Sequence, residues 1–284
     1  MTDGTANDRP NPPIWIFFCM TLLAWAIWIP QALQQHAVID NAPSQQSPLN
    51  GLTVWAPGLA ALVLTWIAAG KRGVTGLFRT LGRVRVPVRW YLAALLLESA
   101  KWGAALGIDR LLGRTYDLQP GILMSSFGAA AAYMVPVALV SALPNALGEE
   151  LGWRAYALPR LQRKHGALVA TLVIGLFWGA WHIPAWIAWG TVEIELLPLL
   201  WKTVSAVPAA IVFTWIFNNT RGSLLLVVLY HASITARWYL HSPLPTRTES
   251  ILTWLIAILV LIFTNRRTFR RGNTQFPAAG EHLF

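Results

Sequence analysis

Three short groups of residues in this chain carry side chains that could hydrolyse a carbonyl compound. In each group two side chains stand four residues apart, so they share one face of a helix. The pairs are Glu150 with Arg154, Trp178 with His182, and His231 with Thr235, and Glu149 directly precedes the first of them. A carboxylate in a partly dry pocket is a good general base. Imidazoles can shuttle protons, support an oxyanion or bind a metal, so the set predicts a hydrolase.

The two adjacent glutamates are expected to have different roles. Arg154 lies one helical turn after Glu150 and is expected to pair with it. Glu149 lies about 100° further round the helix and would then face the pocket as the base. In the second group, Pro184 follows His182 by two residues and is expected to disrupt the helix there.

Each group also has a simpler structural interpretation. Adjacent glutamates at the end of a span are often solvated at the interface, and a membrane histidine is often only hydrogen-bonded to a neighbour. Trp178 and Trp181 could serve in packing or in an interfacial belt, and Thr235 could bond the carbonyl one turn back. These interpretations weaken because all three groups occur together in one chain.

The composition indicates which elements must position these groups. Hydrophobic residues make up 55% of the 284 residues and charged residues only 12%, about half the share typical of a soluble domain. The 16 Trp residues are expected where indole rings sit at the edges of a bilayer. A water-soluble fold is therefore excluded, and the chain is expected to be an integral membrane protein.

Eight apolar segments are candidate spans. They cover residues 14–33, 52–69, 90–106, 122–147, 167–186, 196–217, 224–240 and 251–264. Because the runs are continuous rather than alternating, they predict helices and not a β-barrel. The expected fold is an all-α polytopic membrane protein, one domain over residues 1–284 with about eight transmembrane helices.

The distribution of charge supports this topology. The net charge is +10, but the Lys and Arg residues lie in short segments between spans and form no continuous basic stripe, which argues against nucleic-acid binding. With the N-terminus inside, these residues are several times more frequent in the inner segments than in the outer ones. The positive-inside rule then puts both termini in the cytoplasm, in what is expected to be a bacterial plasma membrane.

Three further ionisable residues fall within spans. Glu98 and Lys101 stand three residues apart on one helix and are expected to form a neutralising structural pair. Lys202 lies near the end of a span, where its ammonium group could reach the interface, and no chemistry is assigned to it.

The ordered set of motifs resembles the CAAX protease and bacteriocin-processing (CPBP) family of intramembrane proteases, which is related to the type II CAAX prenyl endopeptidases. The family pattern is Glu-Glu-x-x-x-Arg, then Phe or Trp with His four residues later, then His with Asn or Asp four residues later. The matching residues here are Glu149, Glu150 and Arg154, then Trp178 and His182, then His231. Thr235 stands where Asn is usual. The resemblance covers about residues 122–240, the expected catalytic core.

The resemblance implies an intramembrane endopeptidase whose site lies between helices near the cytoplasmic side. It implies that Glu149 activates water with the assistance of His182, and that His231 supports the oxyanion together with residue 235. A Thr235 hydroxyl can donate one hydrogen bond but lacks the reach of an amide. The supporting residues would be Glu150, Arg154 and Trp178.

The use of a metal stays open at this point. Glu149, His182 and His231 would be a plausible zinc set, and the family is often described as metalloproteases. The His-Glu-x-x-His spacing of soluble zinc proteases is absent from the sequence. A metal-free glutamate mechanism uses the same residues, and we favour a reaction without an obligatory metal.

The function favoured by the sequence is hydrolysis of a peptide bond in a membrane-bound or lipid-modified protein or peptide. A second hypothesis is a non-catalytic immunity or scaffolding protein that keeps the fold and binds a partner, but retention of Glu149 and both histidines argues against it. A third is a transporter with a proton relay, against which the absence of an inverted repeat argues. No prenyl-specific signature is evident in the sequence.

Overall fold

The computed structural model describes residues 11–114, 141–240, 247–264 and 269, and for residues 236–240 the backbone alone. All regular structure in these ranges is helical, which confirms the expected all-α class. The α-helices are α1 (Ile14–Thr21), α2 (Trp25–Gln35), α3 (Leu49–Arg79), α4 (Val88–Leu111), α6 (Leu143–Glu150), α7 (Leu158–His165), α8 (Ala167–Trp181), α9 (Ile183–Ala188), α10 (Leu196–Asn219), α11 (Leu224–Leu240) and α12 (Arg247–Phe263). Two 3₁₀ turns, η1 (Leu22–Ala24) and η2 (Thr80–Gly82), follow α1 and α3, and a π-helix, η5 (Leu151–Ala157), joins α6 to α7.

Four helical segments in the described part of the chain are long and apolar enough to cross a membrane. They are Ile14–Gln35, Leu49–Gly82, Ala167–Ala188 and Leu196–Asn219. These segments correspond to the first, second, fifth and sixth apolar segments expected from the sequence, and α4, α11 and α12 cover the third, seventh and eighth. Most of the fourth segment lies outside the described residues, so the count of eight spans stays a prediction.

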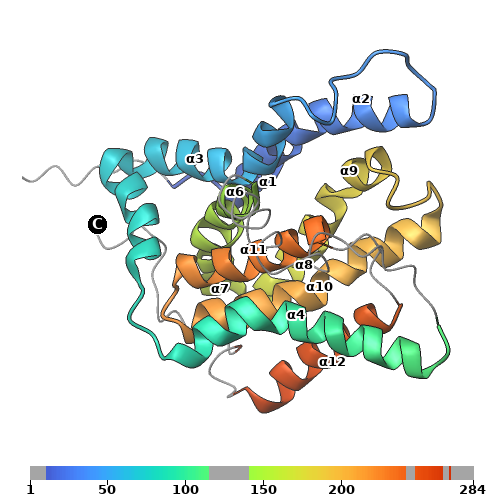
Figure 1. The fold of residues 1–284 in the computed structure, drawn as a ribbon. Coiled ribbons are helices and arrows are strands. Elements are labelled where there is room, and N and C mark those ends of the chain that lie inside the picture. The colour runs from blue at the N-terminus through green and yellow to red at the C-terminus, as the bar shows by residue number, and fades with distance from the viewer. Residues whose placement is uncertain (1–10, 115–140, 241–246, 265–268, 270–284) are drawn as a thin grey trace, which may run out of the picture.

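Helix α11 lies in the middle of the bundle, where it packs against α4, α6 and α10 (Figure 1). Helix α8 packs along α10, and α12 packs against both α10 and α4. The N-terminal helices cover another side, with α1 against α3 and α2 against α9. This arrangement gathers α6, α8 and α11, which carry the three groups of candidate residues, around one interior region.

Helix α3 makes direct backbone contact with the segment that carries the two glutamates. A Cβ added to Gly58 would lie 2.5 Å from the carbonyl oxygen of Gly148, and one added to Gly152 would lie 2.5 Å from the backbone of Pro57. Both sites therefore need glycine, because any side chain would separate the two backbones. The contact fixes the place of α6 and η5, and thereby of Glu149.

A buried ionic cluster joins α4, α11 and α12. The predicted pair of Glu98 and Lys101 is present, with 2.6 Å between the carboxylate Oε2 and the ammonium Nζ. Lys101 also lies 3.6 Å from Glu249 of α12, and the hydroxyl of Tyr230 donates a hydrogen bond of 2.7 Å to Glu98. All four side chains are buried. Buried charges are tolerated when they are paired and hydrogen-bonded, as they are here, and these contacts link the three helices.

Reporter fusions at Gly73 and at Gln45 test the predicted orientation. Gln45 lies in the connection between α2 and α3, and Gly73 lies near the other end of the second candidate span. Because basic residues are concentrated in residues 71–89, around this end of the span, the fusion at Gly73 is expected to report the cytoplasm and the fusion at Gln45 the opposite side. Signals from the same side would overturn the span assignment.

Candidate active site

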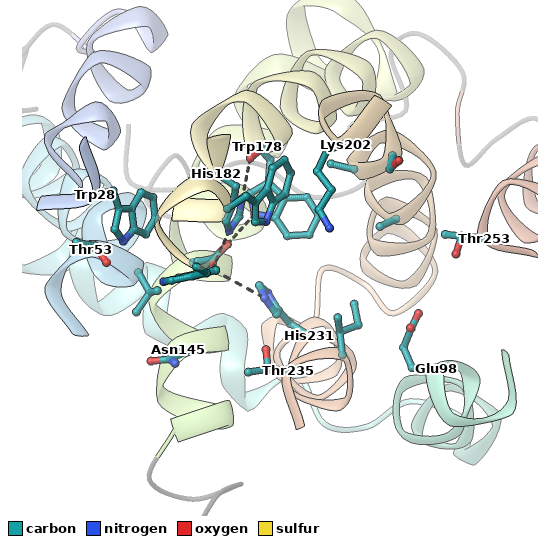
Figure 2. A pocket seen from close by; sticks show the side chains of 18 of the residues that line it. Trp28, Thr53, Glu98, Asn145, Trp178, His182, Lys202, His231, Thr235 and Thr253 are labelled. Carbon is teal, nitrogen blue, oxygen red and sulfur yellow. Dashed lines mark hydrogen bonds and ion pairs between the residues drawn. The ribbon is translucent and has the colours of Figure 1, made fainter. Parts of the chain in front are cut away.

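A cavity of about 800 Å³ lies between the helices. Glu149, Trp178, His182, His231 and Thr235 all line it. Figure 2 shows the side chains of Trp178, His182 and His231 gathered in one region, with His182 at the end of α8 and His231 on α11. The structure thus brings residues from three separate motifs into one site, while their catalytic roles stay predictions.

Glu149 is buried near the end of α6, and its two oxygens have different surroundings. Oε2 accepts a hydrogen bond of 2.7 Å from the indole Nε1 of Trp178. Oε1 lies 3.9 Å from Nε2 of His182 and 3.9 Å from Nε2 of His231. Trp178 therefore holds the carboxylate so that its second oxygen faces both imidazoles.

His182 lies at the break between α8 and α9. Helix α8 ends at Trp181 and α9 begins at Ile183, so the break falls at His182. Pro184 follows two residues later, and it has no backbone N–H with which to continue the hydrogen bonds of α8. The Nδ1 of His182 is 2.8 Å from the carbonyl oxygen of Trp178. A carbonyl oxygen only accepts, so Nδ1 carries the hydrogen, and Nε2 of the neutral ring is an acceptor on the side of Glu149.

His231 is held in the same way from α11. Its Nδ1 is 2.7 Å from Oε1 of Glu150. An ionised carboxylate also only accepts, so Nδ1 carries the hydrogen and Nε2 faces Glu149. Both imidazoles thus direct Nδ1–H toward the protein and present Nε2 to the cavity. The acceptors of Nδ1–H, the Trp178 carbonyl and Glu150, fix the tautomer and the orientation of each ring.

Glu150 and Arg154 form an ion pair buried behind the cavity. Their Oε1 and Nη1 are 2.8 Å apart, and the two side chains are 0% and 1% exposed. The guanidinium also lies over the ring of Phe213, 4.0 Å from its centroid. The predicted pairing is therefore present, and the same Glu150 oxygen that binds Arg154 accepts the hydrogen bond from His231.

The helix that carries this pair changes its hydrogen-bonding pattern at the site. Helix α6 ends at Glu150, and Arg154 lies inside the π-helix η5. Turns of π-helix are rare and frequently occur at functional sites. The sequence predicted a regular α-helix here, because a spacing of four residues does not distinguish the two kinds of helix.

Aromatic side chains complete the walls around His182. The ring of Trp186 stacks on the imidazole at 5.3 Å with an interplanar angle of 13°, and the Lys202 ammonium lies 5.2 Å from the centroid of the Trp186 ring. Trp181 is fully buried and donates a hydrogen bond of 2.9 Å to the carbonyl of Thr21, so its interpretation as a packing residue is confirmed. Trp178, by contrast, contacts Glu149 directly, as described above.

Thr235 lies one helical turn beyond His231 and lines the same cavity. Its hydroxyl has no hydrogen-bond partner among the described residues. The bond to the carbonyl one turn back, which was the simpler interpretation of this residue, is therefore not formed there. The hydroxyl is left as a donor toward the cavity.

The side chains of Glu149, His182 and His231 are a carboxylate and two imidazoles, which are types of group that bind zinc. In a tetrahedral zinc site, ligand atoms at about 2.0–2.1 Å from the ion stand roughly 3.3 Å apart. The separations of 3.9 Å between Oε1 and each Nε2 are wider than this. Within the described ranges no three His, Cys, Asp or Glu side chains are placed closely enough to surround a metal ion in this arrangement. The arrangement as it stands does not fit zinc.

Comparison with known proteins shows which family one segment of this chain is similar to. Residues 130–237, which contain all three motifs, match the family described as Type II CAAX prenyl endopeptidase Rce1-like. The similarity therefore lies in the segment that carries the candidate residues, and the apolar helices agree with a membrane protein.

One curated relative is the CAAX prenyl protease 2 of Methanococcus maripaludis. It is 29% identical over 145 residues, which cover 48% of this chain and 53% of the relative. The chain therefore spans about half the length of the curated relative that it matches. The two matches agree with the resemblance found in the motifs: over this segment the chain is similar to Rce1-like type II CAAX prenyl endopeptidases.

Proposed function

We propose that this chain is an intramembrane endopeptidase that hydrolyses a peptide bond in a membrane-associated protein or peptide by means of a glutamate-activated water. The observation that carries the proposal is the convergence of Glu149 Oε1 with the Nε2 atoms of His182 and His231, each 3.9 Å away. The match to type II CAAX prenyl endopeptidases supports a peptidase in particular. It does not favour the alternative of a non-catalytic scaffolding or immunity protein.

The atoms that face the cavity are suited to hold the attacking water. With hydrogen bonds of about 2.8 Å, one water can reach both Oε1 and one Nε2 across a gap of this size. Its two hydrogens then point to the carboxylate of Glu149 and to an imidazole, because both are acceptors. A lone pair of the water is left for attack on the substrate carbonyl, with Glu149 as the general base.

The bond and proton changes balance within these groups. The water oxygen bonds to the carbonyl carbon while one of its protons moves to Oε1 of Glu149, which gives a tetrahedral oxyanion. When the carbon–nitrogen bond breaks, Glu149 returns this proton to the leaving amine. His182 orients the water through its unprotonated Nε2 and can accept the second proton.

The oxyanion needs hydrogen-bond donors placed before the reaction begins. Because Nδ1 of His231 carries its hydrogen toward Glu150, its Nε2 can donate only when the ring is an imidazolium. The hydroxyl of Thr235 is a donor in either case. We therefore assign support of the oxyanion to Thr235, with a contribution from His231 in its charged form.

The walls of the cavity favour an apolar substrate. They include the indole rings of Trp28, Trp186, Trp189, Trp201 and Trp254. Such walls suit the side chains of a membrane-bound peptide or a hydrocarbon chain attached to it. The curated relative is named for CAAX prenyl substrates, so a farnesylated peptide that ends in C-a-a-X is the first substrate to test.

A comparison of membrane proteomes tests the proposed function in cells. Cells that express Glu149→Gln in place of the wild-type chain are expected to accumulate uncleaved forms of one or a few membrane-associated proteins. The two chains must be present at equal levels, which immunoblotting checks. Identical proteomes at equal protein levels would overturn the proposal.

Substitution of Thr235 tests its assignment as an oxyanion donor. Thr235→Ala is expected to lower kcat while leaving measurable activity, because a single donor contributes at most about 3–4 kcal/mol in well-studied hydrolases. Thr235→Asn is expected to preserve or raise kcat, because an amide also donates. Steady-state kinetics on the peptide measure both variants. A Thr235→Ala protein with wild-type kcat would contradict the assignment.

A further inference from the structure

The site described so far has few donors for an oxyanion. The Nδ1–H groups of both imidazoles are directed to the Trp178 carbonyl and to Glu150. The indole N–H of Trp178 is bonded to Glu149. Of these residues, Thr235 is left to donate when the imidazoles are neutral. Oxyanion sites in hydrolases commonly combine two or more donors.

Asn145 offers a second donor on the same helix as Glu149. The two residues stand four apart on α6, so they share one face, and both line the cavity. Asn145 is half-buried, and its Nδ2 lies 3.5 Å from the Ser141 hydroxyl, which is at the outer limit of a hydrogen bond. A carboxamide carries two N–H donors, so at least one is available to a ligand in the cavity.

The register of α6 and α11 places Asn145 at the level of Thr235. The two helices pack against each other, and Glu149 of α6 lies opposite His231 of α11. Asn145 is one turn before Glu149, and Thr235 is one turn after His231. In Figure 2 both Asn145 and Thr235 are drawn below His231, on the two neighbouring helices α6 and α11.

We propose that Asn145 is a further catalytic residue, whose Nδ2 donates a hydrogen bond to the oxyanion opposite the hydroxyl of Thr235. This inference rests on the proposed function. Asn145 and Glu149 are offset by one helical turn, about 5.4 Å along α6. The reacting carbonyl, together with a hydrogen bond of about 2.9 Å to the amide, can span this offset. The carbonyl carbon then faces the water at Glu149 while its oxygen lies between the amide and the hydroxyl.

The first test is the kinetics of Asn145→Ala on a quenched-fluorescent farnesylated C-a-a-X peptide. We expect kcat to fall by about 10²-fold with little change in KM, because a donor to the oxyanion acts in the transition state and not on the bound substrate. The exposed amide of Asn219, at the end of α10, serves as the matched control. Asn219→Ala is expected to keep the wild-type kcat.

Two further variants separate donation from packing. Asn145→Asp keeps the shape of the side chain but replaces its N–H donors by an acceptor, so its kcat is expected to be no higher than that of Asn145→Ala. The double variant Asn145→Ala with Thr235→Asn returns an amide across the cavity and is expected to recover at least about 10-fold in kcat. A residue that only packs would show the opposite order, with Asp near wild type and no rescue.

The outcomes distinguish this inference from the proposed function. Cleavage that Glu149→Gln abolishes but Asn145→Ala leaves unchanged would overturn the role of Asn145 and leave the endopeptidase intact. Full activity of Asn145→Asp would also overturn it. If the wild-type protein cleaves neither the farnesylated nor the unmodified peptide, the proposed function fails and the inference fails with it.

Discussion

Purified Glu149→Gln protein is expected to hydrolyse the test peptide with a kcat lower by on the order of 10⁴-fold, because the general base is removed. Glutamine has nearly the shape of glutamate, and its carbonyl oxygen can still accept the hydrogen bond from Trp178. The cavity is therefore kept while the group that takes the proton from water is lost. Initial rates of cleavage measure the effect, and an unchanged thermal unfolding midpoint shows that the fold is retained.

An exposed glutamate provides the matched control for this variant. Glu193 lies in the connection between α9 and α10, so Glu193→Gln changes the same charge without touching the cavity and should keep wild-type rates. Cleavage at the wild-type rate by Glu149→Gln would remove Glu149 from the role of base. Complete inhibition by a chelator, reversed by added zinc, would instead make His182 and His231 metal ligands.

The residues with ionisable side chains are the part of the site that the sequence could reveal. Glu149, His182 and His231 are costly inside a membrane, so their presence together in one chain, each in a motif with a four-residue spacing, indicates a functional site. The contact between Glu150 and His231 was not foreseeable, because it joins residues 81 positions apart and depends on how α6 packs against α11. Asn145 was not singled out because a neutral amide near the end of a span carries a smaller cost than a charge.

In the fold, too, the helices could be predicted from the sequence, whereas the contacts between them could not. Continuous apolar runs predicted helices, since the backbone must satisfy its own hydrogen bonds in a bilayer. The close contacts at Gly58 and Gly152 could not be predicted from one chain, because they depend on which backbone lies opposite each glycine. The π-helix η5 after Glu150 was likewise not predicted, because the sequence pattern is the same for an α-helix.

Replacement of Arg154 by Met is expected to lower the free energy of unfolding by about 3–5 kcal/mol, because it leaves the carboxylate of Glu150 buried without its cation. The pair is 2.8 Å apart and almost completely buried. Denaturant unfolding in mixed micelles measures the loss. Lys164→Met, at the exposed end of α7, is the control and should change stability by no more than about 0.5 kcal/mol.

A double variant separates the stabilising role of the pair from its role at the site. Glu150→Leu combined with Arg154→Met replaces both charges by apolar side chains, so its loss of stability should be clearly smaller than the sum of the two single losses. It nevertheless removes the acceptor that fixes Nδ1–H of His231, so its kcat should stay well below that of the wild type. Recovery of stability together with full activity would show that Glu150 does not position His231. Recovery of stability alone is the expected result, because the apolar pair can fill the space behind the cavity but cannot orient an imidazole.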